Sequence, residues 1–434
     1  MPLQTQKEQD AVLHLQRCAL WYNADKRRLY HKDDGNMTEH KPKRPALRLR
    51  RFDLLMLSTA ALLGLVLLFL AEVSNPQRLG ASVAYLAPAY GGVQDVWLAP
   101  LNDPQNPIRL TNTRYGVYDF GVNDDGTKLV YAERRESGQH ELILFNLNTR
   151  QSTRLTMCEA EGADCRTPRF RPSAGGQSVL AYERVALSTR LGMGENATQL
   201  GMGAIRIWLM DLATRETRPL ADDPQFIGHS PRWSLDGGSI AFYSADIANP
   251  GIMVYNFAPA EGQKSLKFVP SQYGAVGTLS PNGAQLIFPD LTRRSDGQIY
   301  AYLRLADLQG LQYVNFSAPE DPIDDTAAEW HPDGQSVVVE RRYTDNRYTR
   351  GYQLYSVDAT TKEVTPLIVD DAYNHGFFAF NSTGSHLLLQ RFPFAPPEGG
   401  NTTPQIWVYE MATGALSLVA DNAFHPRWVV GVGE

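Results

Sequence analysis

The sequence predicts an all-β protein: a seven-bladed β-propeller closed by its C-terminal strand, preceded by one transmembrane helix and a short cytoplasmic amphipathic helix. Three observations predict this. A run of eighteen uncharged residues ends at residue 71, a six-residue apolar strand pattern then recurs seven times, and a glycine turn precedes six of the copies. We expect a basic arm over 1–51, a membrane anchor over 52–73, a linker over 74–82 and a propeller over 83–434.

The N-terminal arm begins with a helix signal. Thr5-Gln6-Lys7-Glu8 has the pattern of a capping box, in which Thr5 caps the helix and Glu8 reaches back to it. Apolar side chains follow at helical spacing, which predicts an amphipathic helix over about 6–23. A helix this short is marginal in water, so we expect it to contact lipid or a cytoplasmic partner.

The uncharged run Leu54–Ala71 predicts the membrane anchor. It would extend roughly 27 Å as a helix, close to the thickness of the hydrocarbon core. A buried core helix is the alternative, but such helices rarely stay apolar on every side for five turns. Six Lys/Arg lie between Lys41 and Arg51, whereas Arg78 is the only one between the run and Asp95. The positive-inside rule then predicts an uncleaved signal anchor in the inner or plasma membrane, with the N-terminus cytoplasmic and the propeller periplasmic or extracellular.

Charge changes sign at the predicted anchor. Residues 1–51 carry twelve Lys/Arg and six Asp/Glu, and the rest of the chain carries 29 and 41, a net charge of −12. An acidic outer domain is a poor partner for nucleic acid, so we expect none. The basic arm could contact anionic lipid or serve only as a topology signal.

Two of the three cysteines fall in the outer region. Cys158 and Cys165 are separated by Glu-Ala-Glu-Gly-Ala-Asp, a loop short enough to be closed by a disulfide. The predicted topology places them in an oxidising compartment, where such a bond persists. Two free thiols remain an alternative, and a metal pair is disfavoured because no histidine lies near them.

The repeated strand pattern sets the size of one structural unit. Each copy lies among polar turns and further short strands, so a unit holds about four strands in roughly fifty residues, as a propeller blade does. The seven copies are Val96–Leu101, Leu142–Leu147, Ile207–Leu212, Ile252–Phe257, Leu303–Leu308, Leu354–Ala359 and Ile406–Met411.

A glycine turn lies upstream of every copy except the first. Asp-Gly and Asn-Gly supply the positive φ that a tight hairpin needs, and a strand such as Ser239–Tyr243 or Ser336–Glu340 follows. The six turns are Asn123–Gly126, Ser173–Gly176, Ser234–Gly237, Ser280–Gly283, His331–Gly334 and Asn381–Gly384.

The two ends of the predicted propeller complement each other. The first unit lacks its turn and inner strand, and Phe424–Trp428 is similar to Ser230–Trp233 of another unit. We therefore expect the C-terminal strand to complete the first blade and to close the ring, which removes two open sheet edges. Two stacked β-sandwiches would not predict this deficit, although six or eight blades remain alternatives to seven.

Ser230–Gly237, Ser239–Phe242 and Ile207–Leu212 resemble the TolB-type propeller repeat. That repeat runs Pro-x-Trp-Ser-Pro-Asp-Gly, then Ile-Ala-Phe, then Ile-Trp-x-Met-Asp, and it extends over 83–430 in degenerate form. Leu235 stands where the repeat has proline. The resemblance implies the fold and says little about function. TolB has a small α/β domain where this chain has its predicted anchor, so the resemblance does not imply a place in the Tol system.

We find no sign of catalysis in the sequence. TolB-like blades also occur in relatives of prolyl oligopeptidase, where an α/β-hydrolase domain catalyses, but no Gly-x-Ser-x-Gly elbow occurs here. His-Glu-x-x-His and Cys-x-x-Cys are also absent from the sequence, and a repeated hairpin turn explains Asn123–Gly126 better than calcium does. Trp97, Trp208 and Trp407 predict packing between blades. We expect no enzyme, no cofactor and no metal site.

Two functions fit these features. The first is a non-catalytic, membrane-anchored propeller that acts as a protein-binding or scaffold subunit of a cell-envelope or membrane protein complex. The second is an extracytoplasmic receptor for carbohydrate or peptide, or a propeller glycosidase, with its ligand in the central funnel. A funnel lined with paired carboxylates and aromatic side chains would favour the second.

The expected topology places the binding residues on one face. Connections between second and third strands share the long-loop face with the connections between blades, and first-to-second turns form the short-turn face. Ser188–Gly203, Arg341–Gly351 and Pro393–Pro404 are long connections on the former, where binding usually resides. The linker would enter at the short-turn face, so the long-loop face would point away from the bilayer. Solvated, mobile loops are the alternative. The predicted protein-binding residues are Arg293, Arg294, Arg341, Arg342, Tyr343, Arg347, Tyr348 and Arg350.

Overall fold

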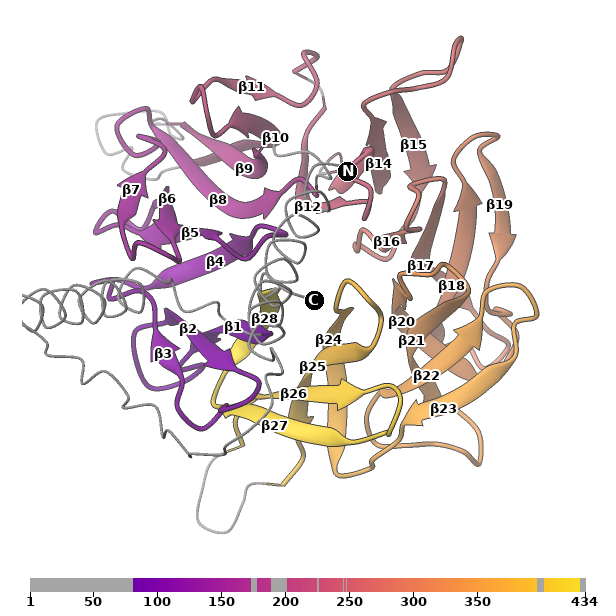
Figure 1. Ribbon diagram of the computed structural model, residues 1–434. Helices are drawn as coiled ribbons and strands as arrows, with labels where there is room; N and C mark the ends of the chain where they lie inside the picture. The colour runs from indigo at the N-terminus through magenta and orange to yellow at the C-terminus, as the bar shows by residue number, and fades with distance from the viewer. Residues whose placement is uncertain are drawn as a thin grey trace, which may run out of the picture. The chain divides into compact units, whose positions relative to one another are not determined.

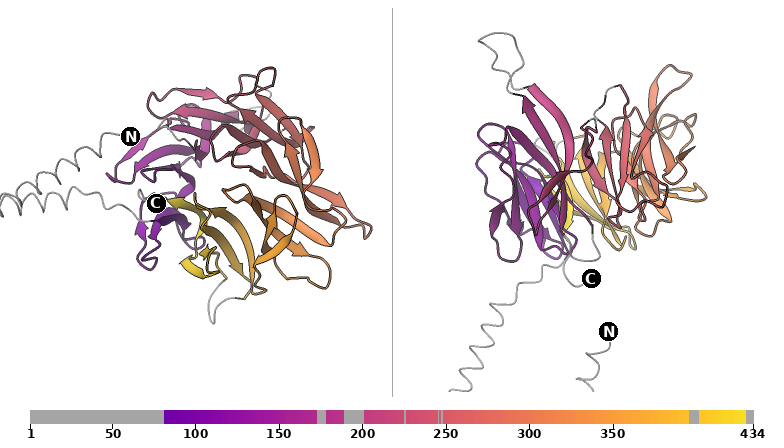
Figure 2. Two further views of the ribbon diagram at one scale, coloured as in Figure 1. Left: turned by 45° about the vertical axis from the view of Figure 1, so that its right-hand side comes forward. Right: turned by 90° about the horizontal axis from the view of Figure 1, so that it is seen from above.

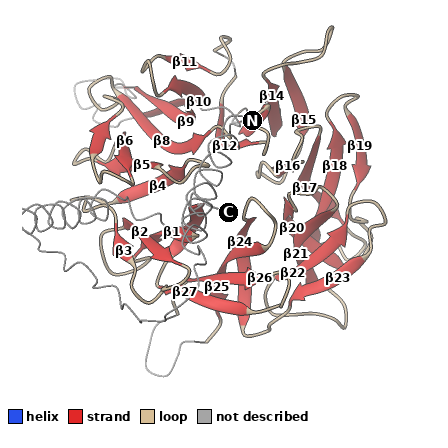
Figure 3. Ribbon diagram, viewed as in Figure 1, coloured by secondary structure: helices blue, strands red, loops and turns tan. Residues whose placement is uncertain are grey.

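The structure is a computed structural model that describes residues 81–172, 178–188, 201–224, 226–244, 246, 248–395 and 402–429. These residues form seven four-stranded antiparallel sheets around one axis (Figure 1), and all their regular structure is β (Figure 3). The predicted seven-bladed propeller is confirmed.

The segment that precedes the propeller lies outside the described residues. It includes the predicted amphipathic helix, the membrane anchor Leu54–Ala71 and nearly all of the linker, which stay predictions. Within the ranges that the structure describes, no helix is long and apolar enough to cross a membrane.

We number the blades from the N-terminus and count their strands outward from the axis. From blade 1 to blade 7, the inner strands are β28 (Phe424–Val429), β4 (Val117–Val122), β8 (Ala163–Phe170), β12 (Gly228–Trp233), β16 (Thr278–Leu279), β20 (Ile323–Trp330) and β24 (Tyr373–Phe380). The second strands are β1 (Ser82–Ala87), β5 (Lys128–Arg134), β9 (Val179–Ser188), β13 (Ser239–Ser244), β17 (Gln285–Arg293), β21 (Ser336–Tyr343) and β25 (His386–Pro393).

The third strands contain the repeated apolar pattern found in the sequence. They are β2 (Asp95–Pro100), β6 (His140–Asn146), β10 (Gly201–Asp211), β14 (Gly251–Asn256), β18 (Ile299–Asp307), β22 (Gln353–Asp358) and β26 (Gln405–Glu410). The outer strands are β3 (Ile108–Arg109), β7 (Ser152–Arg154), β11 (Thr217–Pro219), β15 (Leu266–Pro270), β19 (Gln312–Asn315), β23 (Val364–Ile368) and β27 (Leu416–Asp421).

The C-terminal strand closes the ring as predicted. β28 pairs antiparallel with β1, so that Trp428 faces Val83 and Arg427 faces Ala84. In Figure 1 the yellow strand β28 lies beside the indigo strand β1. The two ends of the propeller thus share one sheet, which leaves neither as an open edge.

The expected glycine turns connect inner to second strands. Gly126, Gly237, Gly283, Gly334 and Gly384 have φ between +64° and +75°. In one such turn the Gly237 N–H donates to the Ser234 carbonyl, and the Ser234 N–H donates to the Ser239 carbonyl. Turn 173–176 lies outside the described residues.

Apolar side chains fill the spaces between neighbouring sheets. The described residues form seven buried clusters, one at each interface between blades. Trp97, Trp208 and Trp407 pack against three of these clusters, as their positions on the third strands predict. Figure 2 shows the sheets standing side by side around the ring. The fold is therefore stabilised chiefly between blades, where each sheet buries both faces.

A β-bulge recurs in the inner strands. The pairing of first and second strands shifts register in blades 1, 2, 3, 4, 6 and 7. Four bulge residues have positive φ, namely Thr167, Ser230, Phe377 and His425. A bulge bends the strand and changes the direction of the side chains that follow, so the residues after the bulge in blades 1, 3, 4 and 7 share one local geometry.

Candidate binding surface

The hairpin of β21 and β22 carries most of the residues predicted to bind protein, and the structure divides them. β21 continues to Tyr343, so Arg341–Tyr343 belong to a strand and not to the expected loop. Arg341 is 6% exposed, and its Nε and Nη2 donate to the two carboxylate oxygens of Asp325 at 2.7 and 2.8 Å. Tyr343 is also buried. The sequence predicts Arg341 and Tyr343 on the binding surface, but both side chains are buried, because they lie within a strand whose sheet packs against neighbouring blades.

Arg342 belongs to a second ion pair at the start of β20. Its Nη2 donates to Asp324 at 2.9 Å, and the Tyr352 hydroxyl donates to the same oxygen at 2.6 Å. The Ala301 N–H donates to the other oxygen of Asp324, so one carboxylate joins blades 5 and 6. Arg342 is half-buried over the Tyr352 ring, and its guanidinium is engaged in contacts within the propeller.

Arg294 also acts within the propeller. Its Nε donates to the Pro319 carbonyl at 3.0 Å and its Nη1 to the Thr344 hydroxyl at 3.3 Å. The guanidinium lies over the Tyr300 ring, 4.1 Å from the centroid. Arg294 thereby ties the β17–β18 turn of blade 5 to the β21–β22 loop of blade 6.

The remaining predicted residues are exposed. Arg293 and Arg350 lie at the surface, and Tyr348 is 58% exposed. Arg347 pairs with Asp345 at 2.7 Å and lies over the Tyr343 ring. The structure thus brings an arginine-rich group to the long-loop face, of which Arg293, Arg347, Tyr348 and Arg350 are available to a partner. We call these four residues the exposed Arg/Tyr set.

Contacts between blades make this face continuous. Arg350 of blade 6 lies over Phe394 of blade 7, 4.2 Å from the ring centroid. A Cβ on Gly351 would lie 2.7 Å from the same ring, so the two loops approach closely there. With the Arg294–Thr344 contact, loops of blades 5, 6 and 7 form one connected surface.

Two carboxylates that the sequence analysis missed lie beside this surface. Burial raises the pKa of Glu340 to about 7, an effect that the Thr326 hydroxyl opposes and to which the nearby Asp324 adds. Burial also raises the pKa of Tyr273 to about 12, with Glu340 and Asp324 adding to the effect. A carboxylic acid with a raised pKa beside a second carboxylate is an arrangement that can hold and donate a proton.

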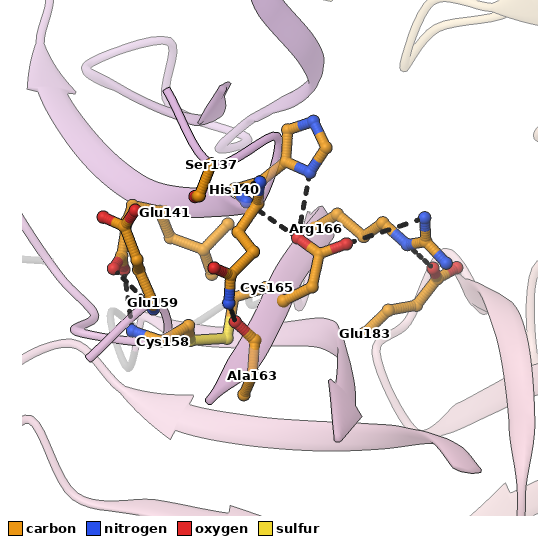
Figure 4. A network of polar contacts seen from close by, with 12 residues as sticks. Ser137, His140, Glu141, Cys158, Glu159, Ala163, Cys165, Arg166 and Glu183 are labelled. Carbon is orange, nitrogen blue, oxygen red and sulfur yellow. Dashed lines mark hydrogen bonds and ion pairs between the residues drawn. A yellow bond between two sulfur atoms is a disulfide. The ribbon is translucent and has the colours of Figure 1, made fainter. Parts of the chain in front are cut away.

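The predicted disulfide is present. Cys158 and Cys165 are bonded, with their Cα atoms 6.0 Å apart, and both are buried. Glu141, which is 0% exposed, accepts hydrogen bonds from the N–H groups of Cys158 and Glu159, both at 2.9 Å (Figure 4). The disulfide and Glu141 therefore fix the connection between blades 2 and 3.

Ionic contacts continue from this loop along the inner strands. His140 Nδ1 lies 2.9 Å from Asp164, and Arg166 lies 3.8 Å from Asp164 and 3.3 Å from Glu183 (Figure 4). Glu183 also accepts the N–H of Ser230 in blade 4 at 2.7 Å. This chain of contacts orders the bulged strands of blades 3 and 4.

A sequence signal for these acidic residues existed and was not used. Glu141, Glu183 and Glu340 interrupt apolar strands of the repeat, and Asp324 and Asp325 open one. An ionisable side chain within a strand that is buried on both faces must be paired or neutralised. Among the described residues, no group of three or more His, Cys, Asp or Glu side chains has an arrangement that could hold a metal ion.

No protein-family model matches this chain, and no curated protein matches it in sequence. Solved structures do match it. A puromycin-hydrolyzing peptidase of Mycobacterium tuberculosis is 14% identical with a TM-score of 0.51, over 80% of this chain and 54% of that one. A puromycin hydrolase variant complexed with PGG is 12% identical with a TM-score of 0.52, over 80% and 53%. The putative TolB of Agrobacterium tumefaciens is 10% identical with a TM-score of 0.42, over 80% and 97%.

At these identities the similarity extends to the fold alone. The chain spans about half the length of the two peptidases, so their activities do not transfer to it. The seven four-stranded blades, with the repeat residues Ser230–Gly237 at the expected turn, confirm the β-propeller fold that the resemblance to the TolB-type repeat implied.

Proposed function

We propose that this chain is a non-catalytic, membrane-anchored propeller that binds another protein of the cell envelope or membrane on its long-loop face. One observation carries the proposal: the exposed Arg/Tyr set lies on a surface that loops of three blades hold together. Arg and Tyr combine contact area, stacking and directed hydrogen bonds, and a braced loop loses less entropy on binding.

Charge supports a protein partner with acidic groups. The region beyond the predicted arm has a net charge of −12, yet the exposed Arg347 and Arg350 flank Tyr348 in the sequence, and Arg293 is exposed at the end of β17. Charges at the rim of an interface mainly raise the association rate and exclude wrong partners.

Co-purification of the full chain in mild detergent tests the proposal. The variant Arg347→Ser/Tyr348→Ser/Arg350→Ser should lose its partner and remain folded, because these three side chains are exposed. The matched control is Leu235→Ser/Gln335→Ser, which changes exposed residues on the short-turn face. Retention of the partner by the triple variant, with loss from the control, would place the interface on the other face.

A second candidate is the receptor or glycosidase, favoured by the raised pKa of Glu340 beside Asp324 and two tyrosines. If these carboxylates act on a sugar, the full chain should release reducing ends from oligosaccharides, and both Glu340→Gln and Asp324→Asn should abolish the release. Unchanged oligosaccharides after incubation with the parent protein would exclude the glycosidase.

A further inference from the structure

Three arginines occupy the same place in the repeat, next to the propeller axis. Arg169, Arg232 and Arg427 each follow a proline and a bulge residue of positive φ, on the inner strands β8, β12 and β28. In each case the bulge interrupts the pairing with the second strand, and the arginine is the residue at which regular pairing resumes. The bulge therefore gives these side chains one common direction, and we call them the axial arginines.

Ionic contacts show that the side chains of the axial arginines point into the ring. Asp119 of β4 accepts a hydrogen bond from Arg169 at 2.7 Å and lies 3.8 Å from Arg427. Arg232 of β12 lies 4.0 Å from Glu329 of β20, although blade 5 separates these two strands. A contact between blades that are not neighbours requires that both side chains point into the ring.

The two carboxylates leave positive charge uncompensated. Asp119 forms one close ion pair, with Arg169, and Arg427 approaches the same carboxylate only at 3.8 Å. Burial, opposed in part by Arg232, raises the pKa of Glu329 to about 7, so near neutral pH it provides only part of a negative charge. Burial and the neighbouring Arg169 and Arg232 lower the pKa of Arg427 to about 9, as expected where cations outnumber their partners.

The guanidinium groups keep donors for a ligand. Arg232 is 52% exposed at its side chain, and among its described contacts it donates to the Gly277 carbonyl at 3.3 Å. Arg427 donates to the Pro426 carbonyl at 3.2 Å and lies over the Phe377 ring, 4.9 Å from the centroid. A guanidinium has five N–H donors in a planar fork, which matches two oxygens of a carboxylate or phosphate.

We propose that the axial arginines form a binding site for an oxyanion, either the carboxylate of a peptide or a phosphate group, at the axis of the propeller. The anion would bind at Arg232 or Arg427, whose nearest described carboxylates lie 4.0 and 3.8 Å away. Glu329 would compete with the anion for Arg232. The site is separate from the exposed Arg/Tyr set, so it does not depend on the proposed protein-binding face.

Calorimetric titration of the full chain in detergent tests the site. The probes are inorganic phosphate, an acetylated hexapeptide with a free C-terminal carboxylate, and the same peptide amidated. We expect saturable binding of phosphate or of the free-acid peptide and none of the amide, and the tighter of the two anions identifies the ligand class. Arg232→Gln should weaken binding at least tenfold, and Glu329→Gln should strengthen it.

The matched control is Arg218→Gln, which removes an exposed arginine and the same charge from the outer strand β11. It should bind both anions as the parent does. Equal affinity of Arg232→Gln and the parent, or weakening by Arg218→Gln as large as that by Arg232→Gln, would overturn the site. If no anion binds but the Arg347/Tyr348/Arg350 variant still loses its partner, the anion site is refuted and the proposed protein-binding function is retained.

Discussion

Removal of the Arg341 guanidinium should destabilise the propeller strongly, although the residue belongs to an arginine-rich hairpin. Asp325 is 0% exposed and accepts two hydrogen bonds from Arg341, at 2.7 and 2.8 Å. Arg341→Leu would leave this carboxylate buried without its cation. Loss of one partner of a buried ion pair costs about 3–5 kcal/mol, because the remaining charge keeps its desolvation penalty.

The matched comparison is Arg347→Leu on the same hairpin. Arg347 also forms a 2.7 Å ion pair, with Asp345, but its side chain is 53% exposed, so the loss should be no more than about 1 kcal/mol. Urea unfolding of the full chain in detergent, followed by tryptophan fluorescence, measures both free energies.

Asp325→Asn completes the comparison with Arg341→Leu. In the double variant neither charge is present, so its free energy of unfolding should lie above that of Arg341→Leu alone. If Arg341→Leu costs no more than Arg347→Leu, the assignment of Arg341 to the interior is refuted, and its place on the binding surface would have to be restored.

Three further predictions concern stability. Gly334→Ala should lower the free energy of unfolding by about 1 kcal/mol, which is the cost of its positive φ alone, because the nearest atom lies 4.0 Å from the added Cβ. Gly237→Ala should lower it by roughly 3 kcal/mol, because its Cβ would also lie 2.0 Å from a backbone carbonyl oxygen. The urea midpoints of the two variants test this difference. Replacing Cys158 and Cys165 with Ser should lower the free energy of unfolding by about 2–3 kcal/mol, and peptide mapping without reductant should find the two cysteines joined in the parent. Glu329→Gln should be more stable than the parent at pH 8, by up to about 3 kcal/mol, and as stable as the parent below pH 5. Because burial raises the pKa of Glu329 to about 7, the folded state favours the protonated carboxyl, and this stabilisation is lost as the pH rises through 7. Urea unfolding at both pH values measures the difference.

The binding residues show where sequence reasoning reached its limit. Arg341, Arg342, Arg347 and Arg350 look alike in the sequence, but the first is buried against Asp325, the second is half-buried against Asp324, and the last two are exposed. Which of these side chains is buried depends on where β21 ends, because residues of the strand pack against neighbouring blades whereas residues of the following loop do not. The enrichment of Arg and Tyr in this segment does not reveal where the strand ends.

The fold, in contrast, could be predicted from the sequence, because each blade is built from local signals that repeat. Positive φ at Gly237 and Gly334 follows from the Asp-Gly turns, and the seven apolar strands follow from their spacing. Closure of the ring by Phe424–Val429 also followed, since the first blade lacked a strand that only the C-terminal segment could supply. These features are local or complementary in sequence, and a chain alone can specify them.

Only the tertiary structure decided which charged side chains meet. Asp119, Arg169 and Arg427 come from three blades. Arg232 and Glu329 come from two blades that are not adjacent, and they are 97 positions apart in the sequence. Their convergence depends on the angle between blades and on the bulge in each inner strand, both of which arise from packing across the ring. The sequence by itself determined seven blades and their turns, because hydrophobic periodicity and glycine φ preferences act within a few residues. The charge balance at the axis and the exposure of the arginines depend on contacts between distant segments, which exist only once the ring has closed.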